Sequence, residues 1–167
     1  MKKVSFIGLG VMGFPMAGHL QSSGYQVTVY NRTQQKAQAW VEMYGGEMAE
    51  TPAAAAKNSD IVFVCVGNDE DLKQVVLGAN GAFSGMKANT ILVDHTTASA
   101  TVARELAEQG KSIGLSFLDA PVSGGEAGAV NGQLTIMVGG EQSAYDAIEP
   151  VMQAYAKFSK LLGKIGS

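Results

Sequence analysis

The sequence predicts an α/β domain with a doubly wound, mostly parallel sheet, and three observations support this fold class. Short β-branched segments alternate strictly with longer Ala-rich amphipathic segments along the 167 residues. Residues 61–66 are apolar throughout, which is typical of a strand that helices cover on both faces. Gly accounts for 21 of the 167 residues, almost twice the usual share of about 7%. This abundance indicates tight turns, or backbone that approaches a ligand closely.

The expected strands are short, apolar and rich in β-branched residues. In chain order they are Val4–Ile7, Gln26–Tyr30, Ile61–Val66, Thr90–Val93, Ser116–Leu118 and Leu134–Val138. Each is followed by a turn and then by an amphipathic segment, except where the next strand follows closely. Because parallel strands need such crossovers, the order favours one sheet built from right-handed β-α-β units.

The expected helices have apolar residues at helical spacing and recognisable ends. They are Met12–Ser22, Gln34–Met43, Pro52–Ala56, Asp69–Leu77, Ser99–Gln109 and Glu141–Tyr155. Thr51 provides an N-cap before Pro52, Gly110 is expected to close the fifth helix, and Pro150 is expected to interrupt the last. No repeat or linker is visible, so residues 1–167 are predicted to form one domain.

Composition argues against several classes of protein. Twelve Lys and Arg and fifteen Asp and Glu are scattered singly, so no basic stripe is available for nucleic acid. No apolar run approaches the roughly 20 residues that span a bilayer, and the apolar stretch near the N-terminus is too short for a signal peptide. Cys65 lacks partners at metal-ligand spacing, so no metal site is expected. These features predict a soluble cytoplasmic protein.

A glycine-rich loop follows the first strand. Its residues are Gly8-Leu9-Gly10-Val11-Met12-Gly13, which fit the pattern G-x-G-x-x-G between a strand and a helix. Gly8 permits the tight turn, Gly10 lets the backbone approach a pyrophosphate, and Gly13 lets helix and strand pack closely. The helix N-terminus then faces the negative charge. The loop therefore predicts a Rossmann-like dinucleotide site, with a purely structural turn as the alternative.

The end of the second strand indicates which dinucleotide is preferred. An acidic residue there, about 20 residues past the loop, would bind the ribose 2′-hydroxyl of NAD. This chain has Asn31-Arg32-Thr33 instead. Arg32 can pair with a 2′-phosphate and stack on adenine, and Asn31 and Thr33 can donate hydrogen bonds. NADP(H) is therefore the predicted cofactor, with NAD still possible; alternatively, Arg32 is a solvated charge and Thr33 caps the next helix.

The segment Gly8–Ala17 resembles the N-terminal signature of the β-hydroxyacid dehydrogenases, a family that includes 3-hydroxyisobutyrate dehydrogenase, tartronate semialdehyde reductase and the glyoxylate/succinic semialdehyde reductases. Asp119-Ala120-Pro121-Val122-Ser123-Gly124-Gly125 resembles its substrate-binding segment. The resemblance implies hydride transfer between NAD(P) and a short β-hydroxyacid or semialdehyde. It also implies that Ser123, Gly124 and Gly125 hold the substrate carboxylate, and that Val66, Asn68 and Thr97 contact the cofactor.

No catalytic residue is assigned within the 167 residues. In the family the general acid/base is a lysine on a long helix after the segment that matches Leu162–Gly166, followed by an all-helical domain that this chain is expected to lack. The resemblance therefore implies that the catalytic lysine lies beyond Ser167, and Lys164 precedes that position and does not match it.

The two histidines are weaker candidates. His95 lies at a strand end without an acid or nucleophile partner, and His19 is expected to be a packed or surface residue. An imine reductase or a non-catalytic NADPH-binding module remain alternatives to the dehydrogenase, and the full-length form is expected to be a homo-oligomer.

Overall fold

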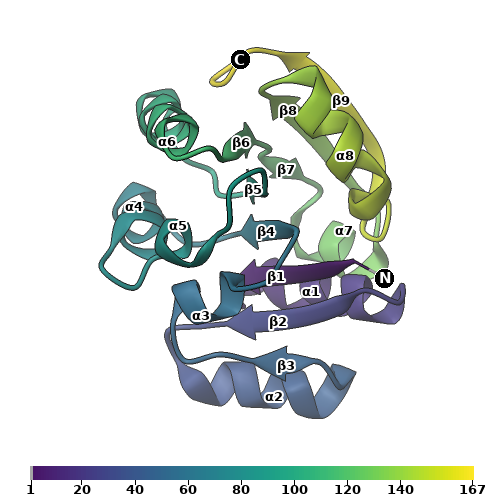
Figure 1. The fold of residues 1–167 in the computed structure, drawn as a ribbon. Helices are drawn as coiled ribbons and strands as arrows, with labels where there is room; N and C mark the ends of the chain where they lie inside the picture. The colour runs from purple at the N-terminus through teal and green to yellow at the C-terminus, as the bar shows by residue number, and fades with distance from the viewer. Residues whose placement is uncertain (1) are drawn as a thin grey trace.

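The computed structural model describes residues 2–167, which form a single sheet with helices on both faces (Figure 1). Within these residues the strand order is β3-β2-β1-β4-β5-β6-β8-β7, and β9 pairs with β8. The strands are β1 (Lys3–Ile7), β2 (Gln26–Tyr30), β3 (Glu47–Met48), β4 (Ile61–Val64), β5 (Ile91–Asp94), β6 (Ser116–Asp119), β7 (Val122–Ser123), β8 (Leu134–Gly139) and β9 (Ala156–Gly163). The predicted doubly wound, mostly parallel sheet is confirmed.

The helices follow the strands in the order that the alternating pattern predicted. They are α1 (Gly13–Ser22), α2 (Gln34–Tyr44), α3 (Pro52–Ala56), α4 (Asp69–Leu77), α5 (Ala82–Gly85), α6 (Ala100–Ser112), α7 (Gly125–Asn131) and α8 (Gln142–Met152). The predicted N-cap of α3 is present, since the Thr51 hydroxyl accepts a hydrogen bond of 3.0 Å from the Ala54 N–H.

Six strands of the sheet, β1 to β6, pair in parallel. From β1 the chain adds β2 and β3 on one side, then crosses over and adds β4, β5 and β6 on the other. The order therefore reverses between β1 and β4, whose carboxyl ends mark the point where such sheets bind ligands. Beyond β6, β8 runs antiparallel to both β6 and β7, and β9 lies parallel to β8.

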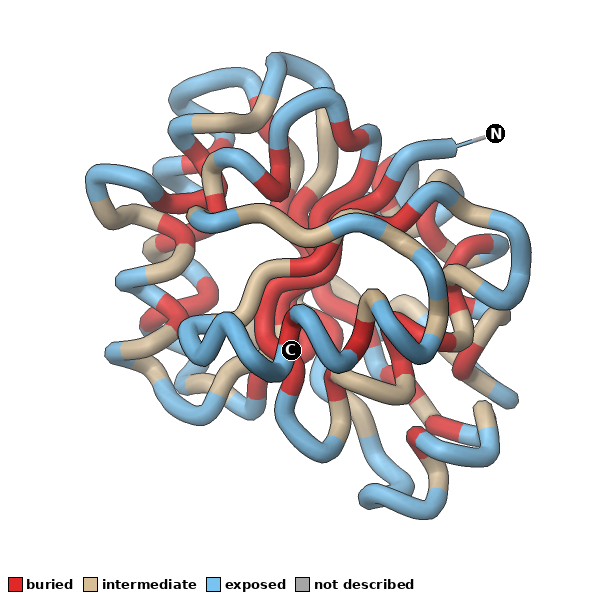
Figure 2. The backbone as a smooth tube through the Cα atoms, turned by 90° about the horizontal axis from the view of Figure 1, so that it is seen from below, coloured by how far each residue is buried: buried red, intermediate tan, exposed pale blue. Residues whose placement is uncertain are grey.

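The core consists of two apolar layers, one on each face of the sheet. One layer joins the sheet to α1, α2 and α8 through buried side chains such as Leu20, Trp40 and Ile148. The other joins it to α4, α5 and α6 through side chains such as Leu72 and Leu106. Figure 2 shows the buried strands passing through the centre, surrounded by exposed turns. In the part of the chain that the structure describes, no helix is long and apolar enough to cross a membrane.

Two predicted helix ends differ from the structure by more than one residue, and the strand predicted over Ile61–Val66 ends at Val64. α6 continues through Gly110 to Ser112. Gly110 lies beside the ring of Phe83, and the left-handed glycine is Gly114 with φ of 81°. α8 includes Pro150 but ends at Met152 rather than continuing to residue 155. Five elements were not predicted: β3, α5, β7, α7 and β9.

Candidate cofactor site

A cavity of about 400 Å³ lies at the carboxyl ends of β1 and β4, where the strand order reverses. Its lining includes the whole predicted glycine loop and two of the three residues that follow β2, Asn31 and Arg32. The complete lining is Ile7, Gly8, Leu9, Gly10, Val11, Met12, Gly13, Tyr30, Asn31, Arg32, Cys65, Val66, Gly67, Asp71, Gln74 and Val75. The cavity is therefore located where the sequence predicted a dinucleotide site.

The glycines of the loop are required for different reasons. Gly8 has φ of 103°, and a Cβ there would overlap the carbonyl oxygen of Cys65, which directly follows the neighbouring strand β4. A Cβ at Gly13 would overlap the carbonyl oxygen of Gly8, so the first turn of α1 packs directly on the loop. At Gly10 a Cβ would meet no atom within 4 Å. Packing of the protein does not therefore require a glycine at position 10, and the missing side chain leaves open space in the cavity wall.

The N-terminus of α1 opens on this cavity. Its N-cap is Met12, which provides no side-chain hydrogen bond to the first turn. The Phe14 N–H donates to the Gly10 carbonyl at 3.0 Å, and Pro15 has no N–H. The start of the helix still carries a partial positive charge. Since Gly10 leaves room beside it, the helix start and the loop amides that precede it can accommodate an anion such as a pyrophosphate.

Asn31 connects the glycine loop to the end of β2 by hydrogen bonds. Its Oδ1 accepts a hydrogen bond of 2.9 Å from the Leu9 N–H, and its Nδ2 donates one of 3.1 Å to the Thr33 carbonyl. The Gly8 N–H also donates to the Tyr30 carbonyl at 2.9 Å. The Asn31 side chain therefore connects the loop to the start of α2, a role that the sequence did not predict.

Arg32 lies at the rim of the cavity, opposite α4. One guanidinium nitrogen is 3.7 Å from a carboxylate oxygen of Asp71, and the Arg32 side chain is 86% exposed. This exposed pair is weak, so the guanidinium remains available to an anionic ligand. Asp71, Gln74 and Val75 form one face of α4, and sequence reasoning did not assign any of them to the site.

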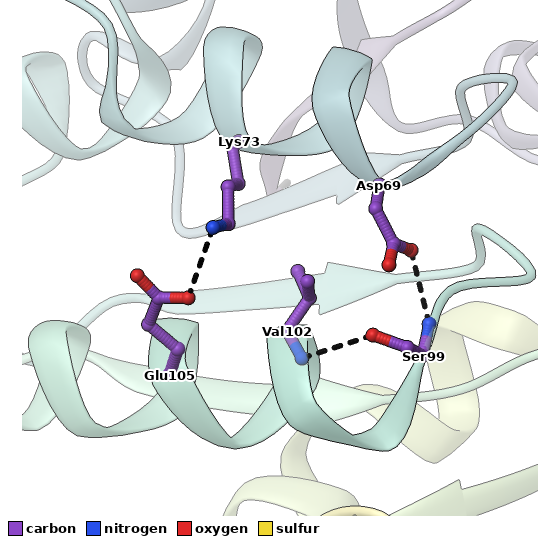
Figure 3. Close-up of polar contacts among 5 residues, drawn as sticks. All are labelled: Asp69, Lys73, Ser99, Val102 and Glu105. Carbon is purple, nitrogen blue, oxygen red and sulfur yellow. Dashed lines mark hydrogen bonds and ion pairs between the residues drawn. The ribbon is translucent and has the colours of Figure 1, made fainter.

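The wall formed by α4 is joined to α6 by two polar contacts, and a third caps α6 itself (Figure 3). The Ser99 N–H donates to Asp69 at 3.0 Å, Lys73 lies 3.2 Å from Glu105, and the Ser99 hydroxyl accepts from the Val102 N–H at 3.2 Å. The Ser99 backbone N–H, followed by its hydroxyl, lowers the pKa of Asp69. The N-termini of both helices are thereby held at the cavity edge of the sheet.

The remaining predicted cofactor residues have different surroundings. The Val66 N–H donates to the Thr96 hydroxyl at 3.1 Å, so Val66 is fixed in the cavity wall by the end of β5. Thr33, Asn68 and Thr97 lie outside the cavity lining. Asn68 caps α4 by accepting from the Asp71 N–H at 2.8 Å, Thr33 precedes α2 without a side-chain capping bond, and Thr97 is exposed.

Three titratable groups lie in or behind the cavity wall: Cys65 is a half-buried lining residue, and Asp94 and His95 are buried. Burial, followed by the charge of Asp94, raises the pKa of the Cys65 thiol to about 12. Burial raises the pKa of Asp94 to about 7, although the N–H and hydroxyl of Thr96 oppose the shift. Burial lowers the pKa of His95 to about 4. His95 is fully enclosed at 1% exposure, so it does not reach a ligand in the cavity.

The predicted substrate residues form an exposed turn after β6. Ser123 ends the short strand β7, which pairs with β8 opposite Thr135, and Gly125 begins α7. Gly124 and Gly125 both have positive φ, 133° and 61°, which explains why glycines occupy these positions. All three residues are exposed, and they follow the carboxyl end of a strand, the same edge of the sheet as the cavity.

The residues after β9 form a turn that lies apart from the cofactor cavity. Ser167 is exposed, and both its N–H, at 3.1 Å, and its hydroxyl donate to the carbonyl oxygen of Lys164. Lys164 lines a separate hollow beside α6 and does not belong to the cavity lining. Ser167 therefore has a local structural role and Lys164 does not reach the cofactor site, whereas the position of the family's lysine beyond Ser167 stays a prediction.

Comparison with known proteins agrees with this geometry. An oxidoreductase from Shewanella frigidimarina, itself uncharacterised, is 62% identical over the whole chain, which spans 57% of that relative. The 3-hydroxyisobutyrate dehydrogenase of Mycobacterium tuberculosis, solved with L-serine, has a TM-score of 0.92 and 30% identity over 99% of this chain and 56% of that one. Psf3, solved in complex with NADP+ and 2-OPP, has a TM-score of 0.93 and 28% identity over 98% of this chain and 58% of that one.

The chain spans little more than half the length of these relatives. The family model that describes the NAD binding domain of 6-phosphogluconate dehydrogenase matches residues 3–166. The predicted resemblance to the β-hydroxyacid dehydrogenases is thereby confirmed, together with the Rossmann-like fold. The chain belongs to the family of NAD-binding domains typified by that of 6-phosphogluconate dehydrogenase.

Proposed function

We propose that this chain is the cofactor-binding part of an NADP-dependent oxidoreductase that transfers a hydride between NADP(H) and a short β-hydroxyacid or semialdehyde. The observation that carries the proposal is the cavity at the switch point, with the uncapped start of α1 beside Gly10 and Arg32 at its rim. The nicotinamide supplies or accepts the hydride, and the residues of this chain bind and orient the cofactor. The general acid/base is proposed to be a lysine beyond Ser167, so none of the residues 1–167 is assigned that role.

The position of Arg32 supports NADP(H) over NAD(H). No acidic residue follows β2, where one would bind the ribose hydroxyls of NAD, and the exposed guanidinium can pair with a 2′-phosphate. Psf3, a structural neighbour, was solved with NADP+. Thr33, Val66, Asn68 and Thr97 are retained as proposed contacts to more distant parts of the cofactor. A cytoplasmic location and a homo-oligomeric full-length form are further proposals.

Ser123, Gly124 and Gly125 are the proposed site for the substrate carboxylate. The serine hydroxyl and the glycine amides are exposed at the same edge of the sheet as the cofactor cavity. A turn with consecutive amides and positive φ can hold an anion. The related 3-hydroxyisobutyrate dehydrogenase was solved with L-serine, which also carries a carboxylate.

Cofactor preference tests the proposal directly. We expect the unmodified protein to bind NADPH at least about tenfold more tightly than NADH, a difference of about 1.4 kcal/mol. Arg32→Ala should remove most of this difference, because it removes the cation that faces the 2′-phosphate. Fluorescence titration with each cofactor measures both affinities. Arg104→Ala on α6 is a control for the loss of one positive charge, and equal affinities in the unmodified protein would contradict the NADP assignment.

The substrate turn can be tested separately by NMR. In protein saturated with NADP+, 3-hydroxyisobutyrate should shift the amide signals of Ser123, Gly124 and Gly125. Ser123→Ala should weaken this binding by roughly tenfold, because a hydrogen bond to a charged group is lost. The affinity for NADPH should not change. Normal carboxylate affinity in the variant would show that these residues only form a turn.

A further inference from the structure

We infer that His95 and His19 are positioning residues that hold the two ends of the segment Ala120–Asn131 against the elements that line the cofactor cavity. The inference rests on the proposed function, because this segment carries the candidate substrate turn Ser123–Gly125. Neither histidine is exposed to a ligand in the way that a catalytic acid would be. Each instead binds a backbone carbonyl at one end of the segment.

His95 holds the first end. Its Nδ1 lies 2.6 Å from the carbonyl oxygen of Ala120, and its Nε2 lies 2.7 Å from the hydroxyl of Tyr155. A carbonyl can only accept, so Nδ1 carries the hydrogen and Nε2 accepts the hydrogen bond from Tyr155. The Ala120 N–H in turn donates to the Asp94 carbonyl at 2.8 Å. The residue that begins the segment is therefore fixed through both of its backbone polar groups.

The imidazole of His95 has little freedom to move. The ring of Phe63 stacks on it with a centroid distance of 5.8 Å and an interplanar angle of 7°. The ring of Tyr155 meets it edge-on at 5.6 Å and 85°. With His95 at 1% exposure and Tyr155 at 0%, the hydrogen bonds are shielded from water. This arrangement keeps Nδ1 directed at Ala120.

His19 holds the second end. Its Nε2 lies 2.9 Å from the carbonyl oxygens of both Ala129 and Val130, in the last turn of α7. The Ala129 carbonyl also accepts from the Gly132 N–H at 3.4 Å. The Nε2–H of His19 therefore adds a side-chain donor to the last carbonyls of the helix, which lack full partners within it. His19 belongs to α1, and α7 lies beside α1 (Figure 1). The segment is thus attached to the helix whose start opens on the cofactor cavity.

Both attachments lead to the cofactor cavity. His95 precedes Thr96, whose hydroxyl accepts from the N–H of Val66 in the cavity wall. His19 lies on the same helix as Gly13, which also lines the cavity. Pairing of β7 with β8 sets the register of the substrate turn. The two histidines then set the place of that turn relative to the cofactor.

Matched variants at His95 test whether its hydrogen bond to Ala120, rather than the packing of its ring, holds this end of the segment. His95→Asn keeps a donor at the place of Nδ1, His95→Gln moves the amide toward the place of Nε2, and Tyr155→Phe removes only the hydroxyl. Amide hydrogen exchange of Ala120, Val122 and Ser123 is compared with that of residues 61–64 in β4, because the Ala120 N–H is hydrogen-bonded and the other two residues pair with β8. We expect His95→Gln to speed exchange at these three residues by about tenfold, the effect of one lost hydrogen bond. In His95→Asn and Tyr155→Phe the exchange rates of these residues should stay within about twofold of those in the unmodified protein.

A second pair tests the other end and allows for the case in which a His95 variant does not fold. His19→Leu should speed exchange at residues 126–131 by about tenfold, whereas His19→Gln, which keeps a donor at the place of Nε2, should stay within about twofold. In NADP+-saturated protein, His95→Gln and His19→Leu should also weaken 3-hydroxyisobutyrate binding while the affinity for NADPH is retained.

Two results would overturn the inference. Equal exchange in the matched variants of both pairs would show that the donors do not hold the segment. If the variants raised the amide exchange rate equally throughout the protein, residues 61–64 included, the histidines would only stabilise the core. If the unmodified protein does not bind 3-hydroxyisobutyrate, the proposed substrate is wrong. The exchange comparison still decides whether the histidines position the segment, since it requires no ligand.

Discussion

Gly10→Ala is expected to lower the affinity for NADPH by at least about 100-fold while leaving the fold intact. An added Cβ at this position meets no protein atom within 4 Å, so the substitution causes no overlap in the protein itself. The methyl group would instead occupy the open space beside the first turn of α1, where the pyrophosphate is proposed to lie. Fluorescence titration with NADPH measures the affinity, and thermal unfolding of the same sample measures the stability.

Gly13→Ala provides the matched contrast. Its added Cβ would overlap the Gly8 carbonyl oxygen, so this variant should lose both stability and cofactor binding. If Gly10→Ala bound NADPH as tightly as the unmodified protein, the pyrophosphate would have to lie elsewhere in the cavity. The proposed role of the glycine loop would then be wrong.

Asp94→Asn is expected to remove the gain in stability that protonation of Asp94 gives the folded protein as the pH falls below 7. Asp94 has its pKa raised by burial to about 7, against about 3.8 when unfolded, so it gains a proton on folding between these values. As pH falls from 7 to 4, this uptake stabilises the folded state by about 3 kcal/mol. The asparagine variant lacks this gain, so its stability relative to the unmodified protein should decrease by that amount over the same range.

His95→Asn should show the opposite slope. Burial lowers the pKa of His95 to about 4 from 6.5, so the unfolded chain binds the proton first and stability is lost as pH falls from 6.5 to 4. The full loss is about 3 kcal/mol, and removal of His95 should abolish it. Urea unfolding of both variants and the unmodified protein at pH 7, 5.5 and 4 gives the two difference profiles. Parallel profiles would contradict the assigned shifts.

The sequence predicted the elements whose signals are local. The fully buried strand β4 contains an uninterrupted apolar run, Ile61–Val64, and α3 begins where Thr51 and Pro52 provide a cap and a first helical residue. The glycine loop was predicted because its G-x-G-x-x-G spacing follows a clear strand and precedes a clear helix. In each of these cases the signal lies in residues that are close together in the sequence.

The elements that were missed depend on distant partners. β9 contains Lys157, Ser159 and Lys160, which interrupt any apolar pattern, and it exists because residues 156–163 pair with β8. α7 contains Gly125 and Gly128, and its last carbonyls bind His19 of α1, 110 residues away from Ala129. Helix propensity did not indicate this helix, because part of its stability comes from that tertiary contact.

The candidate site shows the same limit. The loop and Arg32 were predicted, but the opposite wall, Asp71, Gln74 and Val75, was not. Periodicity identifies α4 as a helix, yet it does not indicate which face meets a cavity, because that depends on how the helix packs on the sheet. The connecting role of Asn31 was also missed, since its partner, the Leu9 N–H, is 22 residues away.

The surroundings of Cys65 make the thiol of the cavity wall slow to react with oxidants. With its pKa raised to about 12, the sulfur is a protonated thiol at neutral pH, and it is the thiolate that reacts with peroxides, disulfides and alkylating reagents. The chain has no other cysteine. Its reactivity towards electrophiles is therefore low, although Cys65 lines the cofactor cavity.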